Sequence, residues 1–208
     1  MEDVLEVYRR PYDPRRPLLC SDEGSKQLLK AKYPAIPMQP GHPERVDYEY
    51  ESDGYCNVFV ACEPLTGQRF VQVRERRTKE DWAFFLRDVL DGPYKEAERV
   101  VLVLDNLNIH SPASFYATFS PEEAWRLTRK LEIHYTPVHG CWLNMAEIEL
   151  SVLARQPLAG RLATLAEVRE QVTAWQEARN RQQVGISWRF TTADARIKLQ
   201  HLYPSIEA

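Results

Sequence analysis

The sequence predicts an α/β domain built on a mixed sheet flanked by helices. Strand-like and helix-like segments alternate along most of the chain, which is typical of layered α/β domains. At 208 residues the chain is long enough for one domain with a sizeable core. With 44% hydrophobic and 27% charged residues, its composition is that of a globular protein and not of a disordered one.

Five segments are predicted to be strands because each is a short run rich in apolar, β-branched or aromatic residues. They are residues 16–22, 55–64, 69–75, 101–104 and 131–137. The turn residues 65–68 join the second and third segments into a predicted hairpin. The continuous apolar run at 101–104 is typical of a strand covered by helices on both faces.

Helices are predicted where capping residues precede a suitable run. Three such starts give helices at 79–90 after Thr78, 121–130 after Ser120, and 165–181 after Thr164. A fourth helix is expected from Trp142 onward, within HGCWLNMAEIELSVL.

Residues 1–16 are polar and punctuated by proline, so we expect a linker there and not a folded unit. A loop is expected at 32–46, where four prolines suit neither a helix nor a central strand. No apolar run approaches the roughly 18 residues of a membrane span, and the N-terminus lacks a secretory signal. The four cysteines form no CxxC pair, which predicts reduced thiols in a cytoplasmic protein without membrane contact.

The net charge of −3 counts against a protein covered by a nucleic-acid-binding surface. It does not exclude an enzyme whose acidic site is bordered by local basic clusters. Such clusters occur at Arg9, Arg10, Arg15 and Arg16, at Arg74, Arg76 and Arg77, and at Arg126, Arg129 and Lys130. The alternative is that these clusters are solvated faces.

Three acids are candidates for a functional site. Asp105 directly follows the apolar run 101–104, and functional groups in open α/β sheets gather beyond the carboxyl ends of strands. A turn or helix cap is the alternative role for Asp105. Asp22 repeats the pattern after its own short apolar run. In the predicted helix from Trp142, Glu147 shares the apolar stripe and Glu149 does not, so burial of Glu147 would need a metal or a partner.

If these three carboxylates converge, they repel one another, and a divalent cation relieves the repulsion. Two carboxylates about 4 Å apart cost roughly 4 kcal/mol at an effective dielectric near 20. Mg²⁺ and Mn²⁺ prefer oxygen ligands, and a pair of such ions can promote phosphodiester displacement. A zinc site at His134, His139 and Cys141 is the alternative, but the spacing is not usual for zinc and Pro137 would break an aligning helix.

Several motifs resemble the bacterial insertion-sequence six-thirty family of transposases, in the mariner-like branch of DDE transposases. They are SDEGSKQL (21–28), PGHPERVDYEYESDG (40–54), VLVLDNLNIH (101–110), LEIHYTPVHGCWLNMAEIELSVLARQPL (131–158) and WRFTTADARIKLQHLYPSI (188–206). The resemblance covers nearly the whole chain, and the HYTPxHGxWLNMAEIE block is the most specific part.

The resemblance implies an RNase H-like catalytic domain at 17–208, with a mixed five-stranded sheet and two Mg²⁺ or Mn²⁺ ions. It implies Asp22, Asp105 and Glu147 as the catalytic, metal-binding triad. The implied activity is DNA end cleavage followed by strand transfer into a TA-type target in double-stranded DNA. Residues expected at the rim of the site, in reach of DNA, are Asn106, His110, His139, Trp142 and Asn144.

The family's N-terminal helix-turn-helix region is expected to be absent, since the chain begins at what resembles the linker before the catalytic domain. Paired transposon ends would suit a homodimer. Two alternatives stay open: a non-catalytic DNA-binding or regulatory remnant of a transposase, and a general RNase H-like nuclease. Three retained acids favour the catalytic hypothesis over the remnant, and the specific HYTPxHGxWLNMAEIE block argues against the general nuclease.

Overall fold

The computed structural model describes residues 1–33, 35–45 and 49–203. It confirms the predicted α/β fold with a five-stranded mixed sheet, in the order β3-β2-β1-β4-β5. The strands are β1 (Leu18–Ala31), β2 (Tyr50–Glu63), β3 (Gln68–Arg74), β4 (Val100–Leu104) and β5 (Leu131–Tyr135). The α-helices are α1 (Glu2–Tyr8), α2 (Lys79–Asp91), α3 (Pro112–Thr118), α4 (Pro121–Arg129), α5 (Ala146–Arg155), α6 (Leu165–Gln182) and α7 (Thr192–Lys198). Two 3₁₀ turns are η1 (Cys141–Leu143) and η2 (Gln200–Leu202).

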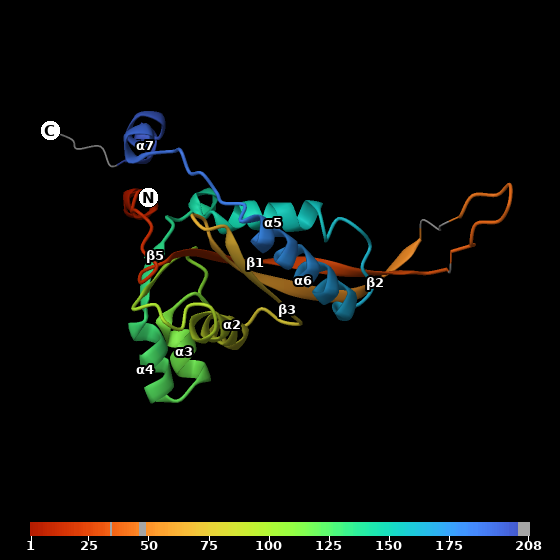
Figure 1. Cartoon of the computed structure of the whole chain (residues 1–208), viewed down its shortest axis with the longest axis horizontal. Helices are drawn as coiled ribbons and strands as arrows, with labels where there is room; N and C mark the ends of the chain where they lie inside the picture. The colour runs from red at the N-terminus through yellow and green to blue at the C-terminus, as the bar shows by residue number, and fades with distance from the viewer. Residues whose placement is uncertain (34, 46–48, 204–208) are drawn as a thin grey trace.

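The sheet is mixed because β1, β2 and β3 form an antiparallel meander while β4 and β5 run parallel to β1. Helices α2, α3 and α4 cover one face, and α5 and α6 cover the other (Figure 1). The first face is closed by a core that includes Trp82, Phe85 and Phe115. On the second face, Leu153 and Val168 pack over Val58 and its neighbours.

The three helix starts that were predicted from capping residues are confirmed. Thr78 and Thr164 each form a reciprocal capping box with the acid three residues later. The Ser120 side chain accepts a hydrogen bond from the Glu123 backbone N–H, and Pro121 occupies the first helical position. The predicted hairpin is also confirmed, since β2 and β3 pair across residues 64–67.

The N-terminal prediction is wrong at residues 2–8, which form α1. Val4, Leu5 and Val7 of this helix are buried, and they join a core cluster with Cys20, Val103 and Leu143. The segment was predicted to be unfolded because it has only three apolar side chains among many polar residues. Their burial depends on contacts with core residues that are distant in sequence. Helices α3 and α7 were likewise not predicted.

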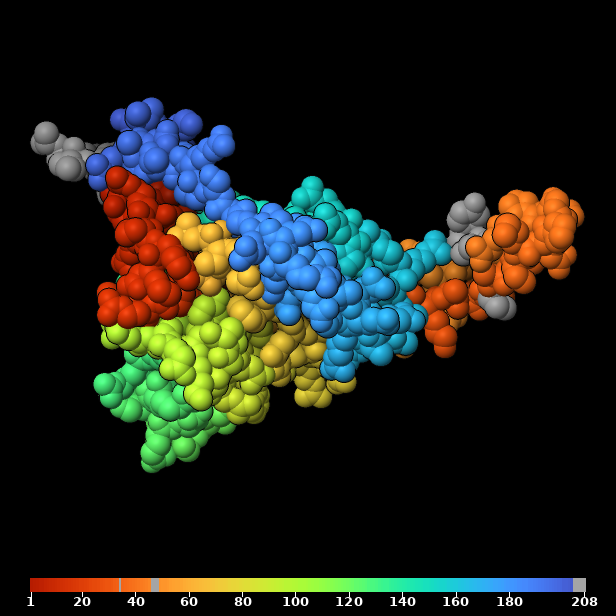
Figure 2. Space-filling view, viewed as in Figure 1, coloured from red at the N-terminus to blue at the C-terminus, as the bar shows by residue number. Residues whose placement is uncertain are grey.

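The first strand is much longer than the predicted segment 16–22. It continues to Ala31 because β2 pairs with it along its length, from Cys20↔Cys62 to Ala31↔Tyr50. The ends of β1 and β2 that are joined by the connecting segment extend away from the helices and form, with residues 35–45, a projecting arm (Figures 1 and 2). Between Ala35 and Arg45, the described part of that connection has only isolated bridges, as its prolines predict. Positions 34 and 46 of the predicted loop lie outside the described residues.

None of the described helices is long and apolar enough to cross a membrane.

Candidate active site

Two of the three candidate acids are brought together by the register of the central strands. Cys20 of β1 pairs with Val103 of β4, and Asp22 and Asp105 each lie two residues further along. Side chains two residues apart on a strand point to the same face of a sheet. The side chains of Asp22 and Asp105 therefore lie on the same face as those of Cys20 and Val103, which are buried. Asp105 directly follows the end of β4, as predicted, whereas Asp22 lies within β1 and not at its end.

Asp22 is a buried carboxyl whose pKa is raised. Its side chain is buried, and burial is the main cause that raises the pKa of the carboxyl from 3.8 to about 7. A hydrogen bond from the Glu23 backbone N–H to Asp22 Oδ1, 2.8 Å long, opposes this rise. The negative charges of Asp105, Glu23 and Glu147 add to it, so all three acids lie within electrostatic reach of Asp22.

Replacing Asp22 with asparagine is expected to stabilise the metal-free protein above pH 7. Between about pH 4 and pH 7 the folded chain holds a proton on Asp22 that the unfolded chain releases. The folded state binds more protons in this window, so stability falls as pH rises through it. Urea unfolding in EDTA should show Asp22→Asn more stable than the wild type by roughly 2–4 kcal/mol at pH 8. The two proteins should converge near pH 4, and equal stability at both pH values would contradict the assignment.

Asp105 is held by its own loop and by His110. Asp105 Oδ1 accepts a hydrogen bond from the Leu107 backbone N–H at 3.0 Å and lies 2.5 Å from His110 Nδ1. Nε2 of the same histidine lies 2.9 Å from Glu23 Oε2. Burial alone would lower the pKa of His110, but the hydrogen bonds to Asp105 and Glu23 outweigh it and raise the pKa to about 9. His110 is therefore protonated at neutral pH and donates to both carboxylates.

Glu23 is a site residue that the sequence analysis missed. It alternates with Asp22 on β1, so it points to the opposite face of the sheet, where Trp82 packs 5.6 Å from the His110 ring. Its Oε1 atom is buried and has no hydrogen-bond partner among the described residues. The adjacent Asp-Glu pair and a histidine five residues after Asp105 were the only available signal.

The prediction that the side chain of Glu147 faces the core is wrong, although its charge does act on Asp22. Glu147 is exposed, whereas Glu149 is fully buried. The predicted stripe assumed a helix running from Trp142, but the α-helix begins only at Ala146, after a separate 3₁₀ turn. Glu147 instead lines a cavity of about 340 Å³ between β1 and α5, together with Ser25 and Leu150.

The buried acid Glu149 has a structural partner in Arg69 of β3. Its two carboxylate oxygens accept from Arg69 Nε at 2.6 Å and from Arg69 Nη2 at 2.7 Å. The Arg69 side chain is 1% exposed and that of Glu149 is 0% exposed. Arg69 also donates to the carbonyls of Gly67 and Val184, so this pair ties α5 to the β2–β3 turn.

The two predicted asparagines occupy different positions. Asn144 is fully buried and its amide donates to the Ser21 carbonyl at 2.9 Å and to Asp22 Oδ2 at 3.3 Å. This contact places Asn144 at the acidic site, just before α5. Asn106 donates instead to the Thr136 carbonyl, which fixes the loop after β4 against the end of β5.

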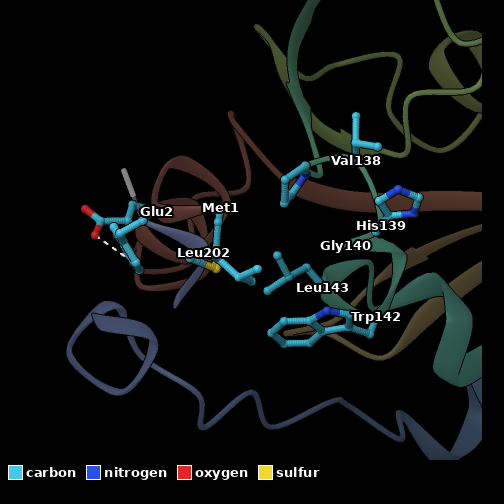
Figure 3. Close-up of a pocket in the computed structure, with 10 residues that line it drawn as sticks. Met1, Glu2, Val138, His139, Gly140, Trp142, Leu143 and Leu202 are labelled. Atoms are coloured by element: carbon cyan, nitrogen blue, oxygen red, sulfur yellow. Dashed lines mark hydrogen bonds between the residues drawn. The ribbon is translucent and has the colours of Figure 1, made fainter. Parts of the chain in front are cut away.

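His139 and Trp142 line a different cavity, of about 530 Å³, between the loop after β5 and the N-terminal helix (Figure 3). Met1 and Leu202 border the same cavity, and the Trp142 ring packs edge-on against Phe190 at 5.6 Å. His139 has a backbone φ of 62°, a conformation that non-glycine residues rarely adopt. None of the contacts among the described residues joins these two side chains to the three acids, so their role at the site stays a prediction.

The donor set at the site fits a divalent cation bound by oxygen. Asp22, Asp105 and Glu147 offer only carboxylate oxygens. Burial, and after it the neighbouring negative charges, raises the pKa of Asp22, and a bound cation would offset both effects. Across the described residues, however, no three His, Cys, Asp or Glu side chains are clustered closely enough to hold a metal ion as they stand. The same result covers His134, His139 and Cys141, the alternative zinc ligands. The four cysteines are free thiols.

Comparisons with known structures support the fold. The chain resembles the Mos1 mariner paired end complex with Mn at a TM-score of 0.57 and 14% identity, over 88% of this chain and 54% of that one. It resembles the Mos1 strand transfer complex at a TM-score of 0.59 and 14% identity, over 88% and 55%. For a pre-cleavage Mos1 transpososome the TM-score is 0.54 and the identity 13%, over 90% and 61%.

This chain thus spans little more than half the length of the Mos1 chains. At such identities the likeness shows the fold alone, and it confirms the predicted RNase H-like architecture. No curated protein matches the chain. The family described as DDE superfamily endonuclease matches residues 17–169. Because this match covers most of the sequence, the chain belongs to the DDE superfamily endonuclease family.

Proposed function

We propose that this chain is the catalytic domain of a DDE transposase, which cuts DNA at transposon ends and joins them to a target. The observation that carries the proposal is the register of β1 and β4, which brings Asp22 and Asp105 to neighbouring positions on the sheet face that α5 covers. The negative charge of Glu147, on α5, also acts on Asp22. Membership of the DDE endonuclease family supports it independently. The insertion-sequence six-thirty family is the finer assignment that we propose from the sequence motifs.

In this proposal Asp22, Asp105 and Glu147 are the ligands of two Mg²⁺ or Mn²⁺ ions. Such ions would activate the attacking oxygen and stabilise the leaving one. The chain's own residues prepare the site. His110 holds Asp105 in place through its 2.5 Å hydrogen bond, and Asn144 holds Asp22 and the start of α5 together. The buried Arg69–Glu149 pair fixes the helix that carries Glu147.

Double-stranded DNA is the proposed substrate, with transposon ends and a TA-type target. The related Mos1 structures are described as a paired end complex with Mn and a strand transfer complex, which supports DNA and a divalent metal here. Since two ends must be paired, we propose that the chain acts as a homodimer.

Metal-dependent nicking of supercoiled plasmid DNA tests this function without knowledge of the transposon ends. The wild type should nick the plasmid in Mn²⁺ or Mg²⁺, and EDTA should abolish the activity. Asp105→Asn should abolish it as well, because the loop would lose a proposed metal ligand. Glu170→Gln removes one carboxylate charge from the exposed surface of α6 and should nick at the wild-type rate. DNA binding with no metal-dependent nicking would favour the non-catalytic remnant.

A further inference from the structure

The turn between β3 and α2, residues 75–77, presents two arginines that the proposed chemistry has not used. Arg76 and Arg77 are both exposed, and neither takes part in an ion pair among the described residues. Arg74, at the end of β3, differs because it lies 3.8 Å from Asp81 and 3.7 Å from Asp88. The basic cluster of the sequence therefore divides into one ion-paired arginine and two available ones.

The start of this turn is tied to β1 by a chain of hydrogen bonds through β2. Asn57 of β2 donates from Nδ2 to the Glu75 carbonyl at 3.3 Å. The same side chain accepts from Ser25 Oγ at 2.8 Å. Ser25 lies three residues after Asp22 on β1 and lines the cavity with Glu147. The turn is thus held to the strand that carries the first acid.

The end of the turn is fixed to the other side of the site. Thr78 caps α2 through its capping box with Asp81, so the helix direction is set immediately after Arg77. In the first turn of α2, the Trp82 ring packs 5.6 Å from His110, which binds Asp105. Both ends of residues 75–77 are consequently anchored to elements of the acidic site.

We infer that Arg76 and Arg77 form a phosphate-binding element next to the acidic site, which holds the DNA backbone beside the scissile bond. The inference rests on the proposed function and assigns the part of the site that binds its substrate. Carboxylates repel a DNA strand, so cationic side chains beside them are needed to bring its phosphates close. Guanidinium groups suit phosphate oxygens, and such contacts position DNA without reading its sequence.

The test measures DNA binding by the full chain, with Ca²⁺ in place of Mn²⁺ and a fluorescent duplex of arbitrary sequence. Arg76→Gln, Arg77→Gln and the double variant are compared with Arg99→Gln. Arg99 is a matched control because it is exposed and directly precedes β4, at the opposite end of that strand from Asp105. Each lost phosphate contact should reduce the slope of log K against log salt by about 0.9, and weaken binding at about 0.1 M salt roughly eightfold. Thermal unfolding of all four variants should match the wild type, since the side chains are exposed.

The outcomes separate this inference from the proposed function. A shallower slope for both single variants, roughly additive in the double variant and absent in Arg99→Gln, would support it. Unchanged slopes in a wild type that binds and nicks DNA would overturn the phosphate-binding element and leave the transposase proposal standing. An equal loss in Arg99→Gln would also overturn it, because it would reveal a diffuse effect of charge. The salt-dependence slope could become shallower in the arginine variants as expected, while the wild type shows no metal-dependent nicking. That result would support the phosphate-binding element and contradict the proposed chemistry.

Discussion

Replacing Glu149 with alanine is expected to lower the free energy of unfolding by about 3–5 kcal/mol, because Arg69 would keep a buried positive charge without its partner. The Arg69 side chain is 1% exposed, and its two contacts with Glu149 are 2.6 and 2.7 Å long. Alanine offers no acceptor to the two Arg69 N–H groups that donate to Glu149. Urea unfolding of the metal-free protein measures the change directly.

A double variant distinguishes a buried ion pair from general damage to α5. Arg69→Met with Glu149→Leu removes both charges at similar volume, so it should recover much of the lost stability. Recovery will be incomplete because the Gly67 and Val184 carbonyls lose their donor, and because Arg179 loses the ion pair that it forms with Glu149 at 3.5 Å. A loss below about 1 kcal/mol for Glu149→Ala would show that the pair is open to water, as at an exposed salt bridge.

Replacing Glu147 with glutamine should leave stability unchanged and abolish most of the nicking activity. This contrasts with the replacement of Glu149, which lies two residues further along the same helix. Glu147 is exposed and makes no ion pair among the described residues, so the free energy of unfolding should stay within about 0.5 kcal/mol of the wild type. Nicking should fall by at least about 10³-fold, or about 4 kcal/mol of transition-state stabilisation, through loss of a proposed metal ligand. Single-turnover nicking in Mn²⁺ measures this loss.

The same preparation of Glu147→Gln should still bind the duplex, which separates the chemical step from binding. Glu170→Gln again provides the charge-matched control. Nicking at a wild-type rate by Glu147→Gln would remove this residue from the proposed triad. Glu23 would then be the next acid to test, since it is buried at the site with an unpartnered Oε1 atom.

The parts of this fold that could be predicted from sequence are those decided by neighbours in the chain. Thr78 and Thr164 cap their helices through residues three positions away, and the β2–β3 hairpin closes over a short turn. Helix α1 could not be predicted this way, because its three buried side chains are stabilised by Leu143 and Val103, which are distant in sequence. The length of β1 similarly depends on β2.

The sequence could indicate which acids are candidates for the site. It could not indicate their burial or their hydrogen-bond partners. Asp105 was found from the apolar run that precedes it, and the register of β1 and β4 places Asp22 beside it. The choice between Glu147 and Glu149 on grounds of burial failed because it depended on where α5 begins and on an arginine 80 residues away. The bridge from Glu23 through His110 to Asp105 joins residues 87 and 5 positions apart, and no periodicity in the sequence indicates the longer contact.

The length of β1 also has a mechanical consequence. From Asp22 to Ala31 one strand runs unbroken from the acidic site into the projecting arm, a span of about 30 Å at the usual rise per residue. An extended strand resists stretching, so a pull on the arm is transmitted along the backbone to Asp22. The register shift between Gln27 and Leu29 is the point at which we expect this strand to bend. A load on the arm is therefore expected to reach the first acid through one continuous backbone.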